Sequence, residues 1–123
     1  MKHEMKKIGN IVDEITTYFL EQNAKELNIK VNTSDEKIEI LVTAKQMSNT
    51  SGIAENLKKY LSYPRAYEME EYYWELAGEN EKEGLAIVGS MVDEAMLDHN
   101  DERLYLKVIR LRHKASSSKK KGN

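Results

Sequence analysis

Apolar residues recur every three or four positions along the first part of the chain, which is the spacing of one face of an α-helix. Most residues between them are polar or charged, so the pattern indicates an amphipathic helix with one buried face. We predict that this helix covers residues 4–27. The apolar positions are Ile8, Val12, Ile15, Phe19 and either Ala24 or Leu27.

After this helix the apolar residues alternate with polar ones, which is typical of a half-buried β-strand. Ile29 and Val31 form a short alternation, and residues 37–44 form a longer one. The segment 32–36 between them reads Asn-Thr-Ser-Asp-Glu, which is rich in turn-forming residues. The sequence therefore predicts a β-hairpin with a loop of about four residues.

Helical spacing returns after the hairpin. Apolar residues at intervals of four predict a helix that Thr50 or Ser51 would cap. Pro64, the only proline, ends this helix or opens the next one, which we predict over residues 65–77 with Gly78 as its end. The apolar positions of the first of these helices are Ile53, Leu57 and Leu61.

One more helix and one more strand complete the pattern. The helix begins near residues 81–84, and a turn over residues 99–101 follows it. Residues 103–112 carry apolar side chains on both faces, so we expect this strand to lie centrally in a sheet. The helix's apolar face would consist of Leu85, Val88, Val92, Ala95 and Met96.

The resulting order, α-β-β-α-α-α-β, predicts an α+β fold. We expect a two-layer α/β sandwich with the helices on one face of a small mixed or antiparallel sheet. Residues 1–113 would form the single domain, and residues 114–123 read by composition as a disordered basic tail.

Composition narrows the function classes. The chain has 123 residues, of which 40% are hydrophobic, enough for one domain with a modest core. Cysteine is absent, which excludes disulfides and thiolate catalysis, and the three histidines indicate neither a metal site nor a catalytic triad.

The net charge of −2 gives no overall attraction to nucleic acid or anionic membranes. No apolar run reaches the roughly 18 residues of a membrane span, and the polar N-terminus is unlike a signal peptide. We therefore predict a cytoplasmic protein.

Residues 84–92 read Gly-Leu-Ala-Ile-Val-Gly-Ser-Met-Val. This segment resembles the start of the helix that follows the glycine-rich ATP lid of the histidine-kinase-type ATPases, the GHKL group, where the chain reads Gly-x-Gly-Leu-Gly-Leu-Ala-Ile-Val. The predicted element order also resembles the core of that fold, over about residues 8–112. The resemblance implies a histidine-kinase-ATPase-like scaffold.

Most residues that bind ATP in that family have no counterpart here. Glu14 matches the Glu of the N-box, but Tyr18 stands where the family has a magnesium-binding Asn. The Asp-x-Gly-x-Gly segment, whose Asp reads the adenine amino group, is replaced by Thr-Ala-Lys-Gln-Met-Ser at residues 43–48, and only Gly52 follows. Ahead of Gly84, acidic residues would repel a triphosphate at the helix N-terminus. These acidic residues are Glu79, Glu81 and Glu83.

An aromatic segment and an acidic segment are two further candidate contact surfaces. Six aromatic residues lie within residues 60–74 and either form a contact surface for a protein partner or close the core. The acidic segment 68–83 is either a solvated helix face or a docking site for a basic partner. The candidate partner-binding residues are Tyr67, Tyr72, Tyr73 and Trp74, and the other two aromatic residues are Tyr60 and Tyr63.

The C-terminal end is basic from Lys107 onwards. It reads either as a nucleic-acid or membrane-surface contact or as a solubilising tail. Because no aromatic residues are interleaved with these charges, a stacking platform for single strands is missing, and we do not expect nucleic acid to be the partner. The candidate contacts would be Arg110, Arg112, Lys114 and Lys119 to Lys121.

Three functional interpretations remain open. The favoured one is a non-catalytic regulatory or protein-interaction module on a GHKL-like scaffold that has lost its nucleotide chemistry, since small relatives in that family act as partner-switching regulators. The second is a nucleotide-binding protein that holds ATP and magnesium through Glu14, Gly52 and Gly84. The third is a small α+β domain that contacts nucleic acid through its basic end. A homo-oligomer could also form if a strand edge at residues 28–33 or 103–112 were open.

Overall fold

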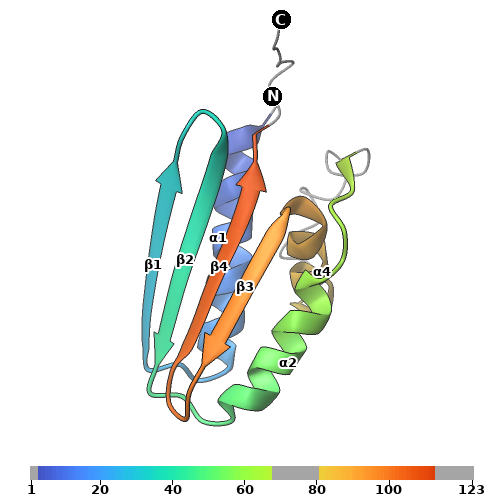
Figure 1. The fold of residues 1–123 in the computed structure, drawn as a ribbon. Coiled ribbons are helices and arrows are strands. Elements are labelled where there is room, and N and C mark those ends of the chain that lie inside the picture. Colours follow the sequence, from blue (N-terminus) through green and yellow to red (C-terminus); the bar gives the residue numbers. More distant parts are fainter. Residues whose placement is uncertain (1–2, 68–80, 113–123) are drawn as a thin grey trace, which may run out of the picture.

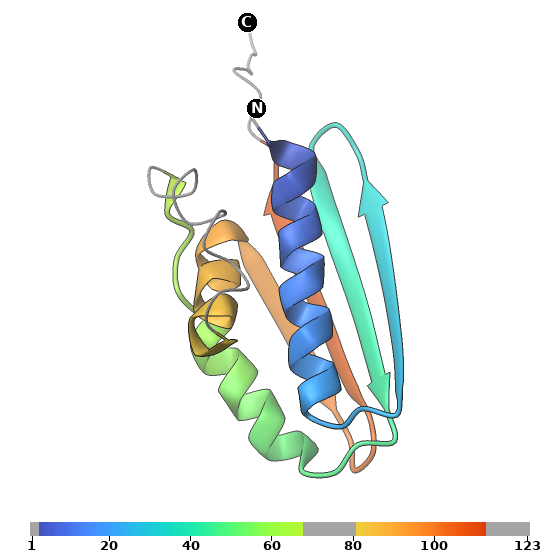
Figure 2. The ribbon, with the colours of Figure 1, turned by 180° about the vertical axis from the view of Figure 1, so that it is seen from behind.

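The computed structural model describes residues 3–67 and 81–112 of the chain. The helices lie together on one face of a single sheet, and no helix of the described part covers the other face (Figures 1 and 2). The predicted α+β architecture with helices on one face is therefore confirmed. The elements are α1 (Glu4–Glu21), β1 (Glu26–Thr33), β2 (Lys37–Lys45), α2 (Thr50–Leu61), α4 (Glu81–Met91), β3 (Glu94–His99) and β4 (Leu104–Leu111).

The sheet has four strands in the order β1-β2-β4-β3, and all neighbours are antiparallel. The predicted hairpin of the first two strands is confirmed, with Val31 opposite Ile40. β4 lies inside the sheet with Leu106 opposite Val42, as its apolar faces predicted. β1 and β3 are the edges, so the prediction of an open edge at residues 28–33 is correct and the one at residues 103–112 is wrong.

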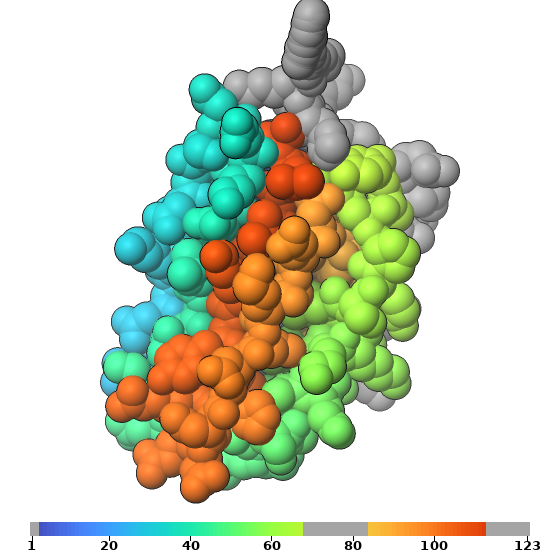
Figure 3. Space-filling model, in the orientation of Figure 1, coloured from blue at the N-terminus to red at the C-terminus, as the bar shows by residue number. Residues whose placement is uncertain are grey.

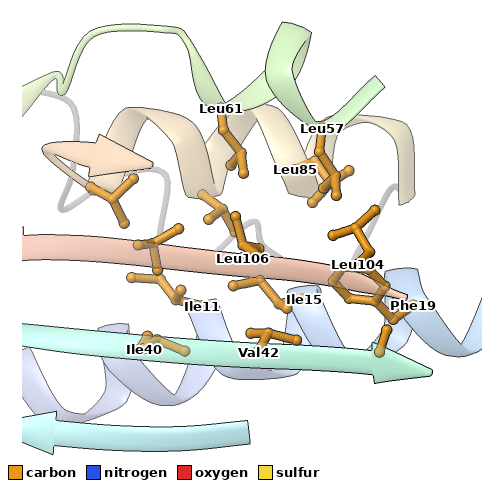
Figure 4. Close-up of a cluster of buried hydrophobic side chains, with 14 of the residues drawn as sticks. Ile11, Ile15, Phe19, Ile40, Val42, Leu57, Leu61, Leu85, Leu104 and Leu106 are labelled. Atoms are coloured by element: carbon orange, nitrogen blue, oxygen red, sulfur yellow. The ribbon is translucent and has the colours of Figure 1, made fainter. Parts of the chain in front are cut away.

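One hydrophobic core fills the space between the helices and the covered face of the sheet (Figure 4). Because side chains alternate across a strand, every second residue of β2 and β4 points into this core. Helices α1, α2 and α4 contribute the residues that face the strands. The labelled core residues of Figure 4 are Ile11, Ile15, Phe19, Ile40, Val42, Leu57, Leu61, Leu85, Leu104 and Leu106.

The first helix is shorter than predicted. It ends at Glu21, and Asn23 adopts the left-handed conformation with φ 66°. The Asn23 N–H bonds to the Leu20 carbonyl at 3.0 Å and the Ala24 N–H to the Phe19 carbonyl at 3.2 Å, which is the Schellman pattern of a helix C-terminus. Leu27, predicted on this helix, lies in β1 instead.

The helix α2 begins where its apolar spacing predicted, but its expected cap is wrong. Asn49 is the N-cap residue and makes no side-chain capping bond. The Thr50 hydroxyl donates to the carbonyl of Asn100 at 2.5 Å, so it ties the helix to the β3–β4 turn. Arg65 and Ala66 are not helical, and the rest of the helix predicted over residues 65–77, with its end at Gly78, lies outside the described residues.

The end of the chain contains a strand that was not predicted. The final helix stops at Met91, and Ala95 and Met96 lie in β3 rather than on that helix. The Asp93 N–H bonds to the carbonyl of Ile109 at 2.7 Å, which starts the pairing with β4. The predicted order α-β-β-α-α-α-β is therefore wrong, because a fourth strand separates the last helix from the last predicted strand.

Candidate functional site

Two of the three residues predicted for nucleotide binding lie against each other. Glu14 on α1 is buried, and its carboxylate fills the space in front of Gly84 in the first turn of α4. A Cβ atom at Gly84 would overlap the Oε1 atom of Glu14 and would lie 2.9 Å from its Cδ atom. A phosphate at this helix terminus would therefore meet a buried carboxylate, which adds to the electrostatic obstacle expected from the sequence.

The third residue, Gly52, belongs to a different place. It lies in the first turn of α2 and lines a polar groove of about 380 Å³ between α2 and the end of α1. There the Asn56 side chain donates a hydrogen bond to the Tyr18 hydroxyl at 3.2 Å, and burial raises the pKa of that phenol. Neither Glu14 nor Gly84 is among the described residues lining this groove. The structure thus brings Glu14 and Gly84 together and places Gly52 at a groove lined by other residues.

Only one of the four predicted partner-binding residues can be placed. Tyr67 is 49% exposed, and its hydroxyl donates to the Oδ1 atom of Asp93 at 3.1 Å. The guanidinium of Arg65 lies 4.3 Å from the centre of the Tyr67 ring, a cation–π arrangement. Tyr72, Tyr73 and Trp74 lie outside the described residues.

Asp93 is the centre of a polar cluster that the sequence did not reveal. Its Oδ2 atom accepts hydrogen bonds from the Arg65 guanidinium at 2.7 Å and from the Leu111 N–H at 2.6 Å. The same Arg65 nitrogen donates to the Leu111 carbonyl at 2.8 Å. The cluster joins the segment after α2 to the ends of β3 and β4. Its partners are widely separated in sequence, so spacing alone gave no signal for it.

Two of the basic residues considered as nucleic-acid contacts, Arg110 and Arg112, lie within the described part of the chain. Arg110 is 1% exposed, and its Nε and Nη2 atoms donate to the Glu4 carboxylate at 3.0 and 2.9 Å. Its Nη1 atom donates to the Met91 carbonyl at 2.7 Å. The reading of Arg110 as a nucleic-acid contact is therefore wrong. Arg112 donates to the Ser34 carbonyl at 3.0 Å, and the basic residues from Lys114 onwards lie outside the described residues.

The uncovered face of the sheet carries an apolar strip that sequence reasoning missed. Side chains of β2, β4 and β3 line a shallow depression of about 230 Å³ on this face, which is the face seen in Figure 3. On this face, Met96 of β3 is 48% exposed and Tyr105 of β4 is 37% exposed. Leu41 belongs to the same face and lies on β2, the strand next to β1. The alternation along β4 could have revealed the strip. Tyr105 and Leu111 alternate with the core residues of this strand, so their side chains point to the opposite face of the sheet.

Charged side chains lie within and beside this strip, since Lys107 on β4 pairs with Leu41 on one side and with Met96 on the other. The Glu39 carboxylate lies 3.3 Å from the Lys37 ammonium and 3.5 Å from that of Lys107. The hydrogen bond from Lys37 is the main cause that lowers the pKa of Glu39, and the charge of Lys107 acts in the same direction. The face thus combines exposed apolar side chains with an ion pair that reaches between them through Lys107.

Comparison with known protein families, with curated proteins and with solved structures finds no match. The resemblance of residues 84–92 to the histidine-kinase-type ATPases therefore stays a prediction. Residues 3–67 and 81–112 contain no group of three or more acidic or histidine side chains arranged to hold a metal ion. In the same residues, every helix is too short or too polar to cross a lipid bilayer.

Proposed function

We propose that this protein is a non-catalytic protein-interaction module whose contact surface is the uncovered face of the sheet. The apolar strip of Leu41, Met96 and Tyr105 on that face carries the proposal. The cores of protein interfaces are enriched in aromatic residues and methionine and are bordered by polar residues. The exposed methionine and tyrosine of the strip agree with this composition, and Glu39, Lys37 and Lys107 supply the charged groups.

The roles of two ion pairs support the same conclusion. Arg110 and Glu4 pair inside the protein, and Arg65 and Asp93 join chain segments. Each of these groups therefore has a structural task. A histidine-kinase-type scaffold is compatible with the α1-β1-β2 order and with the contact of Glu14 and Gly84, but the proposed function does not depend on it.

A substitution on the strip tests the proposal. Met96→Glu replaces an apolar side chain of the strip by a charge, and because Met96 is exposed on an edge strand, the fold should remain intact. We expect a partner captured from the cells of origin to bind this variant at least about tenfold more weakly, the effect of removing an interface anchor. The measurement is affinity capture with quantitative mass spectrometry, followed by calorimetric titration of the purified partner.

The matched control is Met5→Glu, which introduces the same charge at an exposed methionine on α1. It should bind the partner as the unmodified protein does. Equal losses in Met5→Glu and Met96→Glu, or partner binding that Met96→Glu leaves unchanged, would contradict the assignment of the contact surface.

The nucleotide-binding alternative makes a separate prediction. We expect millimolar ATP with magnesium to leave the melting temperature unchanged, because the Glu14 carboxylate occupies the space in front of α4. A ligand that binds only the native state at a hundred times its dissociation constant stabilises it by roughly 2.7 kcal/mol. A thermal-shift titration therefore detects binding readily. A clear upward shift that Gly84→Glu abolishes would favour nucleotide binding instead.

A further inference from the structure

We propose that two copies of this chain associate through the β1 edges, which pair antiparallel about a two-fold axis at Ile29 and join the two sheets into one. This inference does not rest on the proposed function. It concerns the edge of the sheet, whereas the protein-contact surface proposed above lies on its face.

The free edge of β1 presents backbone groups that a second strand can bind. The Ser34 N–H bonds to the Lys37 carbonyl, so Ser34 belongs to a hydrogen-bonded pair with β2. Hydrogen-bonded and non-hydrogen-bonded pairs alternate in an antiparallel ladder. The even-numbered residues of β1 therefore point their backbone groups at β2. Leu27, Ile29 and Val31 point theirs outward.

The two edges of the sheet differ in how they are protected. At the other edge, α2 packs beside β3, and the two lie side by side in Figure 1. β1 lies beyond α1 at the opposite end of the sheet in both ribbon views. Its eight residues contain no proline, one of the devices that keep natural edge strands from pairing.

The helix-facing side chains of β1 are only partly covered within one copy. Leu27 and Ile29 are half-buried and pack against the core, while Val31 is 41% exposed. A two-fold axis at Ile29 places Leu27 opposite Val31 of the partner subunit and Ile29 opposite Ile29 of the partner subunit. Pairing would therefore cover three apolar side chains from each copy while it satisfies the outward backbone groups.

The charges on the other side of β1 fit the same register. Lys30 lies opposite Asn28 of the partner subunit, and Glu26 lies one diagonal step from Lys30 of the partner subunit, within reach of long side chains. No like charges face each other. The register thus places apolar side chains of β1 opposite apolar side chains of the same strand and brings no like charges together, which favours a second copy as the occupant of the edge.

Neighbouring registers fit less well. An axis at Lys30 would place two ammonium groups directly opposite each other, which is destabilising. An axis at Asn28 would pair Glu26 directly with Lys30 of the partner subunit, but it would place Val31 opposite Lys25 of the partner subunit. Exposed ion pairs contribute little to stability. The burial of apolar side chains therefore favours the register with its axis at Ile29. An axis that lies between two residues would place each residue whose backbone groups point outward opposite one whose backbone groups point at β2. The two strands could then not form a regular ladder of hydrogen bonds.

Single cysteines test this geometry cleanly because the chain contains no cysteine of its own. Paired residues at the axis have Cα atoms about 5.5 Å apart, which suits a disulfide. We expect the full-length Ile29→Cys variant to form a covalent dimer on mild oxidation. Thr33→Cys is the control on the same side of the strand. Its two copies would lie roughly 25 Å apart and should not crosslink.

A second pair of variants tests association without a crosslink. Val31→Lys puts a charge opposite Leu27 of the partner subunit, while in one copy position 31 is exposed. We expect its dimer dissociation constant, measured by sedimentation equilibrium, to rise about tenfold or more. Met5→Lys adds the same charge on α1 and should dimerise like the unmodified protein. A monomer at all concentrations, or crosslinking of Thr33→Cys as efficient as that of Ile29→Cys, would overturn the proposal.

Discussion

Replacing Arg110 by alanine is expected to lower the free energy of unfolding by about 3–5 kcal/mol, the range for breaking a buried ion pair. The substitution removes both hydrogen bonds to the buried Glu4 carboxylate and the one to the Met91 carbonyl. Single domains are stable by only about 5–15 kcal/mol, so this loss is a large share of the total. Urea denaturation followed by circular dichroism measures it.

Two comparisons show whether the buried charge is the cause. Lys37→Ala removes an exposed ammonium 3.3 Å from Glu39 and should change the stability by no more than about 1 kcal/mol. The double variant Glu4→Leu with Arg110→Met removes both charges together and should recover much of the loss, because apolar side chains often replace a buried pair well. If Arg110→Ala lowered the stability no more than Lys37→Ala, the Glu4–Arg110 pair would have no such role.

The elements that could be predicted from the sequence are those whose apolar spacing fits one structure only. The alternation of β2 and the four-residue spacing of α2 each matched the observed element closely. Val92, Ala95 and Met96 fitted a helical face, yet Ala95 and Leu97 also alternate as in a strand. Pairing with β4 decides between the two. That pairing is a contact between distant residues, which local spacing does not contain.

The candidate site was less accessible from the sequence for a related reason. Arg110 was read as part of a basic run, since composition records charge but not burial. A signal was nevertheless present, because Arg110 has the same strand phase as the core residues Leu104, Leu106 and Val108. Its partner Glu4 lies 106 positions away, so only the folded chain identifies the pair. The apolar strip of the open face is likewise assembled from three strands.

Gly89→Ala is expected to destabilise the protein by about 3 kcal/mol, the upper end of the usual range for overpacking. Gly89 lies on α4 where this helix meets α2. A Cβ atom there would overlap the Tyr60 carbonyl oxygen and lie 3.3 Å from the Leu61 Cα atom. Both are backbone atoms, so the contact can be relieved only if one helix moves. The measurement is again equilibrium denaturation.

The matched control for this prediction is Gly9→Ala. Gly9 also lies within a helix, but no atom other than those of its own local backbone comes within 4 Å of the Cβ position. Alanine is favoured over glycine in a helix by about 0.5–1 kcal/mol, so this variant should be more stable than the unmodified protein by that amount. The same chemical change is thus expected to act with opposite signs on α4 and α1. A Gly89→Ala variant that was also more stable than the unmodified protein would mean that intrinsic helix propensity outweighs the close approach of α2 and α4.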